Sequence, residues 1–508
     1  MRNLLLLLCA ISFTTVTFAQ QPYTLTDDDV VVENGFITKC TYGFNNTIII
    51  IPETLDGQTV RGIREKVFYY KKISALKLPS TLETISESAF QRNSLTSITI
   101  PNSITIIEKS AFRGNALISI NFESNCNLTS IEESVFQGNV LATLTIPSSI
   151  TTIGKSAFQE NSLSSIHFED NSSLTSIGES AFQKNSLTSI TIPNSVKSIG
   201  KYAFYQNPIT SITFGSSSSL IFIEDYAFCG NPLTSLTIPN SVTNIGKGVF
   251  KGKSLANVTF ESNSKLTSIG EEAFLGNSIT AIIIPNSVTN IGKNAFYGNP
   301  ITNLTFESNS SLTTIGENAF KRNSLTSIII PNSVSAIGNS AFQENSLSTI
   351  TIPNSVTEIG NNAFQGNSLT SITFEENSNL YSIGDYAFAG NPLTSITIPN
   401  SVALIGKGAF KTKLLTSVTF ESNSKLTSIG DYAFYENSLT SISIPESVEK
   451  IGYSAFDRNP LKSLVLPASV KENHTFINWK DSNGTYYNGG DAISNLKLSY
   501  TAQFTYKF

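Results

Sequence analysis

Apolar and polar residues alternate in short runs that recur along most of the chain. In the stretch NSLTSITIPNSVKSIGKYAF, residues 185–204, the segment 189–192 alternates with the two-residue period of a β-strand. The pattern predicts that its two isoleucines point into a core and that Ser189 and Thr191 face solvent. Pro193 then removes a backbone donor, so we expect strand pairing to stop there and a turn to begin.

Close copies of this stretch follow one another, and each copy ends in an Ala-Phe or Val-Phe pair whose phenylalanine we call the marker Phe. The marker spacing takes only two values, which is typical of a solenoid whose coils bury a core only by stacking. Eighteen markers predict about 18 coils. The marker residues are Phe68, Phe90, Phe112, Phe136, Phe158, Phe182, Phe204, Phe228, Phe250, Phe274, Phe296, Phe320, Phe342, Phe364, Phe388, Phe410, Phe434 and Phe456.

The two spacings define a short coil, as from Phe182 to Phe204, and a long coil, as from Phe158 to Phe182. Short coils end the strand in Ile-Pro, as at Ile192, and long coils end it in Phe, as at Phe168. Because the two types mostly alternate, we expect large and small inward residues to interdigitate in a super-repeat of two coils. The alternation fails at one interior place, where two short coils follow each other.

Two further columns of residues repeat from coil to coil. Asn stands three residues after the marker Phe in fifteen of the eighteen coils, which predicts a buried column that satisfies turn backbone groups. Three residues before the marker, opposite charges alternate, as in Lys155, Glu179, Lys201 and Asp225, and this predicts attraction between neighbouring coils. The charge column becomes neutral, as Asn339 and Asn361, where the coil lengths lose their alternation.

The repeat L-x-x-I-x-I-P-x-x-V-x-x-I-G-x-x-A-F-x-x-N resembles the leucine-rich repeats of bacterial surface proteins of the Bacteroides and Treponema (BspA-like) type, over residues 47–470. The resemblance implies a mainly β, curved leucine-rich-repeat solenoid with β-rich end caps. It also implies export and adhesion to host, matrix or cell-surface proteins. Members of that family share no catalytic residues, so the resemblance assigns none here.

The ends of the chain depart from the repeat. Residues 1–19 have the layout of a secretory signal peptide, with one positive residue, an apolar run and small residues before Gln20. Residues 20–46 contain Asn34-Gly35 between β-branched runs, which predicts a tight hairpin in an N-terminal β cap. Residues 471–508 contain F-x-x-W, N-G-x-x-Y-x-x-G-D and a closing A-x-F at Ala502 to Phe504. In these motifs they resemble the second half of a Listeria-Bacteroides repeat, which implies a small C-terminal β cap.

Composition excludes several classes of function. The 508 residues carry a net charge of −5 with no basic block, so we expect no nucleic-acid partner. No stretch after the signal peptide is long and apolar enough to span a membrane. The two histidines lie 307 positions apart and no catalytic motif is present, so the sequence predicts neither an enzyme nor a bound cofactor or metal. Cys126 and Cys229 each stand at a position where the other coils carry a different residue, and we interpret both as free thiols.

The outward strand positions form one candidate binding surface, which we call the strand face. Of its 34 residues, 26 are Ser or Thr, and Ser189, Thr191, Ser211 and Thr213 represent it in two neighbouring coils. The face offers none of the large anchors that protein-binding hot spots favour, namely Trp, Tyr and Arg. Its departures from Ser and Thr include His167, Ile283 and Ile329, which we interpret as contact residues or as isolated surface substitutions.

Tyrosines near the marker Phe form the second candidate surface. They gather in two clusters, which offer the amphipathic anchors that the strand face lacks, although the rings could instead only cover the seam between coils. The first tyrosine cluster is Tyr202, Tyr205 and Tyr226, and the second is Tyr432, Tyr435 and Tyr453.

The sequence therefore favours a monomeric, non-catalytic binding protein, secreted or at the cell surface, that resembles an adhesin and recognises a protein or glycan on a cell or matrix surface. An alternative hypothesis is that the regular Ser and Thr hydroxyls of the strand face bind an ordered lattice, such as ice or a polysaccharide.

Overall fold

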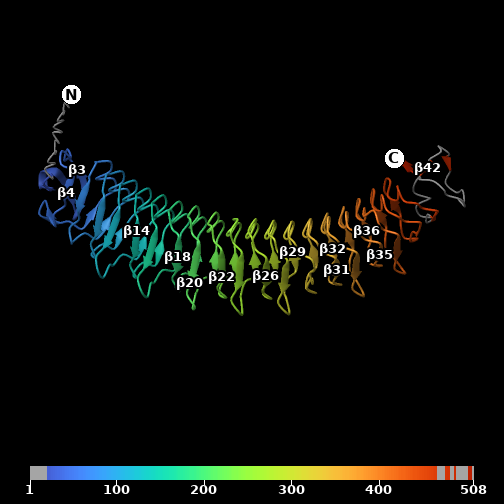
Figure 1. Cartoon of the computed structure of the whole chain (residues 1–508). Coiled ribbons are helices and arrows are strands. Elements are labelled where there is room, and N and C mark those ends of the chain that lie inside the picture. The colour runs from blue at the N-terminus through green and yellow to red at the C-terminus, as the bar shows by residue number, and fades with distance from the viewer. Residues whose placement is uncertain (1–19, 466–474, 481–485, 488–500, 506–508) are drawn as a thin grey trace, which may run out of the picture. The chain divides into compact units, whose positions relative to one another are not determined.

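The computed structural model describes residues 20–465, 475–480, 486–487 and 501–505. The predicted signal peptide, residues 1–19, lies outside these ranges. The chain divides into two compact units between Leu128 and Thr129. Both are built almost wholly of short strands and turns, as the repeat predicts, and each is described separately below (Figure 1).

The first unit contains the predicted hairpin, formed by its second and third strands. These strands pair antiparallel, and Asn34 and Gly35 have φ of 53° and 78°, the left-handed conformations that a two-residue turn between such strands requires. The second strand of the hairpin, β3, then pairs parallel with β7, so the hairpin covers the sheet edge of the first coil. The unit contains β1 (Tyr23–Thr24), η1 (Asp27–Asp29), β2 (Val30–Glu33), β3 (Phe36–Cys40), β4 (Ile48–Ile50), β5 (Thr54–Leu55), β6 (Gln58–Thr59), β7 (Gly62–Ile63), β8 (Ala75–Lys77), β9 (Thr84–Ile85), β10 (Ser97–Ile100), β11 (Ile106–Ile107) and β12 (Ser119–Phe122).

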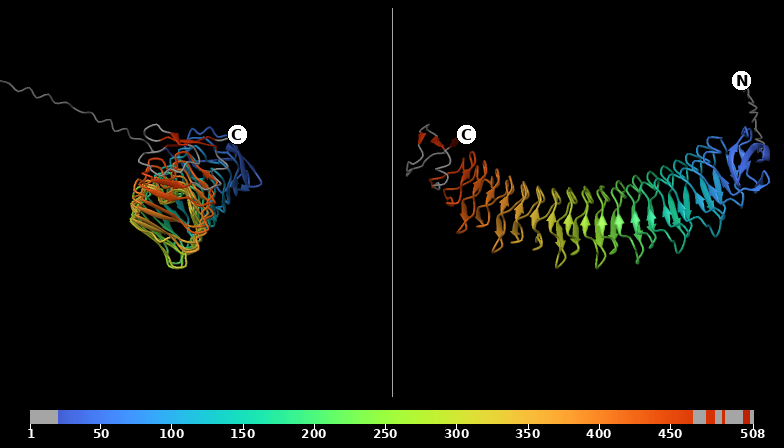
Figure 2. Two further views of the ribbon diagram at one scale, coloured as in Figure 1. Left: turned by 90° about the vertical axis from the view of Figure 1, so that its right-hand side faces the viewer. Right: turned by 180° about the vertical axis from the view of Figure 1, so that it is seen from behind.

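The second unit is a stack of coils that follow a shallow arc in chain order (Figure 1, Figure 2). One two-residue strand from each coil joins a parallel sheet of 15 strands. Together with β7, β9 and β11 of the first unit, these strands number eighteen, one before each marker Phe, which confirms the predicted number of coils. The 15 strands are β13 (Ser130–Ile131), β15 (Thr152–Ile153), β17 (Ser176–Ile177), β19 (Ser198–Ile199), β21 (Phe222–Ile223), β23 (Asn244–Ile245), β25 (Ser268–Ile269), β27 (Asn290–Ile291), β29 (Thr314–Ile315), β30 (Ala336–Ile337), β32 (Glu358–Ile359), β34 (Ser382–Ile383), β36 (Leu404–Ile405), β38 (Ser428–Ile429) and β40 (Lys450–Ile451).

The longer strands of the second unit, which carry the strand face, pair two by two. In the pairs that end in Ile and Phe, the strand of a short coil pairs with the strand of the coil that follows it. The strand face is therefore divided into two-strand ribbons, whereas the 15-stranded sheet runs through the whole stack. The ribbons are β14 (Thr143–Ile146) with β16 (Ser165–Phe168), β18 (Ser189–Ile192) with β20 (Ser211–Phe214), β22 (Ser235–Ile238) with β24 (Asn257–Phe260), β26 (Ala281–Ile284) with β28 (Asn303–Phe306), β31 (Thr349–Ile352) with β33 (Ser371–Phe374), β35 (Ser395–Ile398) with β37 (Ser417–Phe420), and β39 (Ser441–Ser443) with β41 (Ser463–Val465).

One coil is left out of this pairing. Residues 327–330 occupy the place of a strand between the β26–β28 ribbon and the β31–β33 ribbon, but they form no strand. The alternation of short and long coils fails at this coil. Its segment has no partner strand, because the ribbons on both sides already contain two strands. Ile329 lies on this segment with its side chain 88% exposed.

The marker phenylalanines stack along the interior of the unit. Neighbouring rings, such as Phe204 and Phe228, lie 5.0 to 5.9 Å apart between centroids and nearly parallel, and the rings are buried. In contrast, the Phe that ends a strand, as at Phe168 or Phe214, is only half-buried, so the expected close interdigitation of large and small strand residues is wrong. Each of these residues lies on a strand with a hydrogen-bonded neighbour on one side only, which leaves part of the ring uncovered.

The predicted asparagine column is confirmed. The amide of Asn185 donates to the carbonyls of Phe158 and Phe182 at 3.0 and 3.1 Å, and its oxygen accepts the N–H of Leu163 at 3.0 Å. One side chain thus satisfies backbone groups of two consecutive coils, and the pattern repeats along the stack. Loss of such a buried partner would leave several backbone groups unsatisfied.

The charge column forms ion pairs at some steps only. Lys155 pairs with Glu179 at 3.1 Å, and the Lys and Glu of later coils make two similar bridges. Lys201 instead lies with its ammonium 5.4 Å from the centroid of the Tyr202 ring, and its backbone N–H donates to Glu224. The prediction that every step of the column is an attractive pair of side chains is therefore too simple.

Short acidic and amide side chains of this column make a different contact. Asn339 accepts the backbone N–H of Asn361 at 2.8 Å, and Asn361 accepts that of Asp385 at 2.7 Å. Asp385 accepts the N–H of Lys407 in the same way. The neutral asparagines therefore continue the column through the main chain, in addition to avoiding contact between like charges.

The C-terminal described segments form a three-stranded antiparallel sheet in the order β43 (Tyr486–Tyr487), β42 (Thr475–Lys480) and β44 (Thr501–Thr505). These strands fall within the predicted C-terminal β cap, whose boundaries remain a prediction. Across the described ranges, the structure contains no helix with the length and apolar character needed to cross a membrane.

Candidate functional site

The three residues of the first tyrosine cluster come from two consecutive coils, and their rings lie next to one another. The rings of Tyr202 and Tyr226 stack at 5.2 Å with an interplanar angle of 8°, and Tyr205 meets Tyr202 edge-on at 5.5 Å. All three rings are half-buried, so they cover the seam between coils and also keep open surface. The cluster has the aromatic area that protein partners use as anchors.

The backbone orients two of these tyrosines in an unusual way. In every coil the residue two before the marker Phe is left-handed, with φ between 49° and 60°, and both Tyr202 and Tyr226 occupy this position with φ of 57°. In the next coil the position is Gly248, where a Cβ would lie 2.5 Å from the Tyr226 ring. The glycine therefore makes room for the tyrosine, and the ring lies flat across it.

The second tyrosine cluster has a related geometry. Tyr435 meets Tyr432 edge-on at 5.4 Å, as Tyr205 meets Tyr202, but Tyr453 also meets Tyr432 edge-on, at 5.5 Å. The difference arises because Tyr453 stands three residues before its marker Phe, in the charge column. Desolvation, and after it the neighbouring Tyr453, raises the pKa of the Tyr432 hydroxyl. Tyr453 is 48% exposed.

Cations of the chain itself surround Tyr435. The ammonium of Lys411 lies 4.8 Å from the ring centroid, and the guanidinium carbon of Arg458 lies 5.3 Å from it. Lys407 lies 5.8 Å from the ring of Tyr432. The second tyrosine cluster is therefore partly occupied by contacts within the molecule, which are of the cation–π type.

A shallow hollow adjoins the first tyrosine cluster, and the sequence did not predict it. It has a volume of about 310 Å³ and is lined on one side by Lys201 and Asp225, which directly precede Tyr202 and Tyr226 in the chain. Phe222 lines it with its ring 49% exposed. The sequence contains one sign of this hollow, because most coils carry Ser, Thr or Asn at the position of Phe222.

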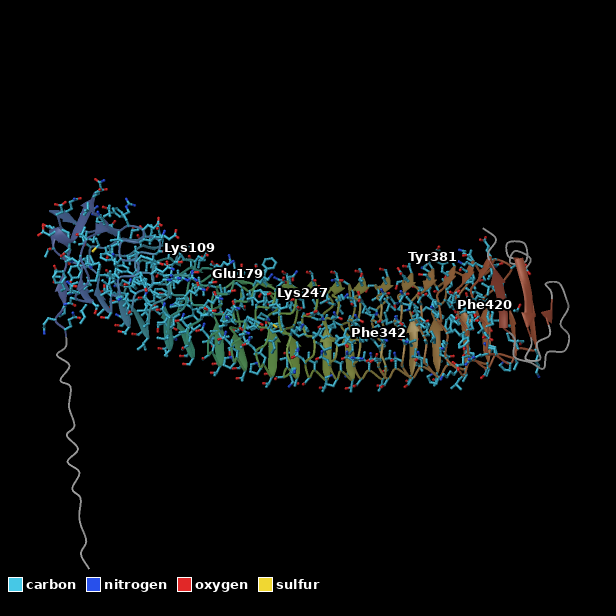
Figure 3. All side chains as sticks on the ribbon, turned by 90° about the horizontal axis from the view of Figure 1, so that it is seen from above. Lys109, Glu179, Lys247, Phe342, Tyr381 and Phe420 are labelled. Carbon is cyan, nitrogen blue, oxygen red and sulfur yellow. The ribbon has the colours of Figure 1, made fainter. Side chains whose placement is uncertain are left out.

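A second exposed apolar pair was also missed. Tyr381 is 57% exposed, and Leu404 of the next coil is exposed beside it, with the Leu404 N–H donating to the Tyr381 carbonyl at 3.3 Å. Figure 3 shows Tyr381 on the same margin of the second unit as Glu179 and Lys247, whereas Phe342 lies in the interior. This pair and Phe222 thus lie on the side of the coil that carries the 15-stranded sheet, whereas the exposed Ile283 and Ile329 lie on the strand face.

The strand face has the exposed hydroxyls that the sequence predicts. Ser189 and Thr191 of β18 lie opposite Ser211 and Thr213 of β20, and all four are exposed. A second hollow, of about 520 Å³, opens on this face between β37 and β39, where Thr419 and Ser443 contribute to its lining. Because the strands pair two by two, the hydroxyls repeat with the period of a ribbon.

The residues that interrupt the strand face do not form one patch. His167 is exposed on β16 and lies opposite Thr145, away from the two isoleucines. Ile283 is exposed on β26 and lies opposite Thr305. The coil that contains Thr305 lies between Ile283 and Ile329, which is on the unpaired segment.

The described residues contain no group of three or more His, Cys, Asp or Glu side chains placed to hold a metal ion. Cys40, Cys126 and Cys229 are free, in agreement with the interpretation of the last two as thiols. Burial raises the pKa of the Cys40 and Cys229 thiols, which keeps them protonated and weakly nucleophilic at neutral pH.

Comparison with known proteins agrees with the repeat. The sequence profile described as "BspA type Leucine rich repeat region (6 copies)" matches residues 61–182, 151–274, 267–382 and 357–483, which together span most of the chain. No curated protein sequence matches the chain.

Among solved structures, a leucine-rich repeat protein shows the same fold, and two further proteins are similar in sequence at a lower level. A leucine-rich repeat protein from Bacteroides ovatus is 24% identical, with a TM-score of 0.54, over 77% of this chain and 97% of that one. The pneumococcal vaccine antigen PcpA is 21% identical over 85% of this chain and 93% of that one, with a TM-score of 0.30. A leucine-rich cell surface protein from Faecalibacterium prausnitzii is 21% identical over 78% and 92%, with a TM-score of 0.31. From the repeat profile and the fold together, the chain belongs to the BspA-type leucine-rich-repeat family.

Proposed function

We propose that this protein is exported through residues 1–19 and acts, secreted or at the cell surface, as a non-catalytic, adhesin-like binding protein. Its partner is a protein on a host, matrix or cell surface, and the first tyrosine cluster is the main contact. Family membership supports a binding role based on the repeats. The observation that carries the choice of surface is the grouping of half-buried tyrosines beside a hollow that exposes Phe222.

The energetics of recognition favour this surface over the strand face. Aromatic rings supply large contact area at a low entropic cost, and binding energy concentrates in a few such residues. The strand face presents small hydroxyls that water already solvates, so replacing water by a protein partner gains little there. Binding to an ordered lattice by this face remains the second candidate, and it requires the hydroxyls rather than the tyrosines.

A pair of matched variants separates the two surfaces. The tyrosine variant combines Tyr202→Ala, Tyr205→Ala and Tyr226→Ala, and the hydroxyl variant replaces Ser189, Thr191, Ser211 and Thr213 by Ala. Binding is measured by surface plasmon resonance against a panel of extracellular-matrix and cell-surface proteins, and inhibition of ice recrystallisation is measured in parallel. Circular dichroism and thermal unfolding check that both variants keep the fold.

We expect the tyrosine variant to lose at least about 2 kcal/mol of binding free energy, or about thirtyfold in Kd, as a central aromatic hot spot would. The hydroxyl variant should bind a protein partner nearly as well as the natural chain. If the hydroxyl variant loses binding and the tyrosine variant keeps it, the assignment of the tyrosine cluster is wrong. Recrystallisation inhibition that only the hydroxyl variant loses would favour the lattice.

A further inference from the structure

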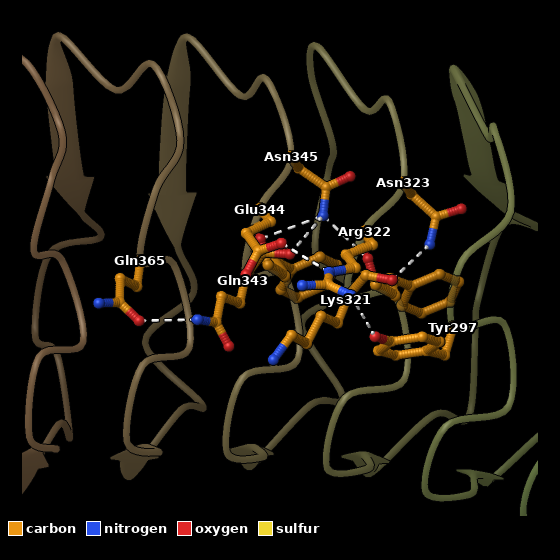
Figure 4. Close-up of polar contacts among 10 residues, drawn as sticks. Tyr297, Lys321, Arg322, Asn323, Gln343, Glu344, Asn345 and Gln365 are labelled. Carbon is orange, nitrogen blue, oxygen red and sulfur yellow. Dashed lines mark hydrogen bonds and ion pairs between the residues drawn. The ribbon is translucent and has the colours of Figure 1, made fainter.

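An arginine of one coil repeatedly covers a tyrosine of the coil before it. The clearest case is Tyr297, whose hydroxyl accepts a hydrogen bond from Nη1 of Arg322 at 3.0 Å (Figure 4). The guanidinium carbon lies 6.0 Å from the ring centroid, and Nε of Arg322 donates to Glu344 at 2.7 Å. The tyrosine directly follows a marker Phe, and the arginine stands two residues after the next marker.

The same combination occurs twice more. In the first unit, Nη1 of Arg92 donates to the hydroxyl of Tyr69 at 3.3 Å. In the second tyrosine cluster, the guanidinium of Arg458 lies 5.3 Å from the ring of Tyr435. In each pair the two residues hold the same positions relative to their marker Phe, so this fold has a recurrent place for a guanidinium beside the tyrosine.

Tyr205 is the fourth tyrosine at this position, and the coil that follows it lacks the arginine. The residue 25 positions later, which matches the spacing from Tyr297 to Arg322, is Gly230. A Cβ at Gly230 would have no heavy atom within 4 Å, so an arginine side chain placed there would begin in open space. Within residues 20–465, no Lys or Arg lies over the Tyr205 ring and no side chain or backbone group hydrogen-bonds its hydroxyl.

The nearby cations of the same columns are neutralised by other groups. Lys184, in the coil before Tyr205, pairs with Glu160 at 2.8 Å. Lys251, two coils after Tyr205, pairs with Glu272 at 2.8 Å. Each ammonium is therefore held by its own carboxylate, and neither occupies the place beside Tyr205.

We propose that the open side of Tyr205 binds the guanidinium of an arginine side chain that a protein partner presents. The ring face attracts the cation through its quadrupole, and the phenolic oxygen accepts a hydrogen bond from the planar fork. The inference rests on the proposed function and gives the chemistry of the partner. The internal arginine beside Tyr297 is the template for the bound group, because it shows how this coil geometry receives a guanidinium.

The test uses the full chain labelled with 3-fluorotyrosine and acetyl-arginine-amide as the probe, followed by fluorine NMR. The Tyr205 resonance is identified by its absence in Tyr205→Phe. We expect it to shift on titration with the arginine probe and to respond at least about twofold more weakly to acetyl-citrulline-amide, the neutral isostere, since a cation–π contact at an exposed site changes affinity by about this factor.

Two variants make the test specific. Gly230→Arg should fill the site from within, shift the Tyr205 resonance before any probe is added, and abolish its titration. Arg92, Arg322 and Arg458 occupy this position with φ of 56–57°, so Gly230→Arg requires the backbone to move from φ of 78° toward that value, and thermal unfolding checks that the variant keeps the fold. Arg322→Gly should uncover Tyr297 and make that resonance respond to the probe.

A Tyr205 resonance that ignores the arginine probe, or that responds equally to citrulline, would overturn the proposal. A titration that persists unchanged in Gly230→Arg would do so as well. Because the probe replaces the natural partner, these results do not depend on the proposed function. If the tyrosine variant keeps its partner while Tyr205 still titrates with arginine, the site is real and the proposed function is wrong.

Discussion

The two tyrosine clusters share one edge-on pair of rings and differ in what surrounds that pair. Tyr205 meets Tyr202, and Tyr435 meets Tyr432, at almost equal distances and both edge-on. Around Tyr435 the neighbouring coils supply Lys411 and Arg458, whereas the coil after Tyr205 supplies a glycine. The same residue at the same place in a coil is thus satisfied within the molecule in one case and left open in the other.

This difference shows how a repeat scaffold can acquire a site. The coil fixes where a tyrosine points, and the residue in the adjacent coil decides whether the ring is closed or accessible. A single position, such as the one two residues after the marker Phe, can therefore open or close a contact without any change in the core. The proposed site accordingly depends on a departure between neighbouring coils rather than on the consensus.

The largest expected effect is on the free energy of unfolding, and it comes from the asparagine column beneath the two clusters. Asn207 donates to the carbonyls of Phe182 and Phe204, accepts the N–H of Leu187, and lies inside the stack. Asn207→Ala should lower the free energy of unfolding by about 3 kcal/mol, because it leaves several buried backbone groups unsatisfied. Urea unfolding followed by circular dichroism measures the change.

The matched variant beneath the second cluster is Asn459→Ala. Asn459 makes equivalent bonds to Phe434, Phe456 and Leu439, but the Phe456 ring is 8% exposed, so its surroundings are less completely desolvated. We expect a loss of about 2 kcal/mol here. Equal and small losses, below about 1 kcal/mol at both sites, would contradict a role for the asparagine column in stability.

A smaller effect is expected from the charges beside the clusters. Lys201→Glu removes the cation near Tyr202 and places a carboxylate between Glu179 and Asp225. It should cost about 0.5 to 1 kcal/mol at low salt and less at high salt, because the side chains are exposed and screened. Thermal unfolding at two ionic strengths measures this cost.

Lys407→Glu tests the same change beside the second cluster, between Asp385 and Asp431, and Lys201→Gln is the neutral control. Neutralising the flanking carboxylates as Glu179→Gln and Asp225→Asn should recover part of the stability of Lys201→Glu, because it removes the like charges on either side of the introduced carboxylate. If Lys201→Glu matches the natural chain at low salt, the charge column contributes nothing at this step.

The smallest expected effect is on the pH dependence of stability, and it concerns the hydroxyl of Tyr432 in the second cluster. Desolvation and Tyr453 raise the pKa of Tyr432 in the folded chain above its usual value, so the unfolded chain loses this proton first as pH rises. Tyr432 therefore stabilises the fold fully below its unfolded pKa of about 10, and this contribution is lost as pH rises through the folded pKa.

Tyr432→Phe should consequently flatten the decline in stability at alkaline pH. Urea midpoints measured between about pH 9 and pH 11 give the two profiles, since this window contains the ordinary tyrosine pKa. Parallel profiles for the variant and the natural chain would mean that Tyr432 titrates alike in both states.

Periodicity predicted the parts of this structure that every coil shares. The number of coils, the hairpin at Asn34-Gly35 and the contacts of the asparagine column follow from local turn chemistry and from the burial of repeated positions. The tyrosine clusters were also visible, because coils of known spacing place Tyr202 and Tyr226 in one column.

Features that depend on the fit between particular coils were not predicted. The exposed ring of Phe222 and the pairing of strands in ribbons both depend on contacts with neighbouring coils. The left-handed backbone at Tyr202 is shared by every coil, but the hydrophobic pattern gives no sign of it. An alignment of the coils shows that Tyr297 and Arg322 hold positions that other Tyr and Arg residues share. That the two side chains contact each other became clear only from the hydrogen bond between them. Reasoning from a single coil misses such pairs, since their members belong to different coils.

The two-strand ribbons have a consequence for how such a chain changes its length. Duplication or deletion of one short and one long coil together adds or removes a whole ribbon and keeps every strand paired. Duplication of a single coil leaves a segment without a ribbon, and residues 327–330 are in that condition. The coil pair is therefore the smallest module by which this stack can grow or shrink with all of its long strands paired, and residues 327–330 show the loss of pairing that an odd coil causes.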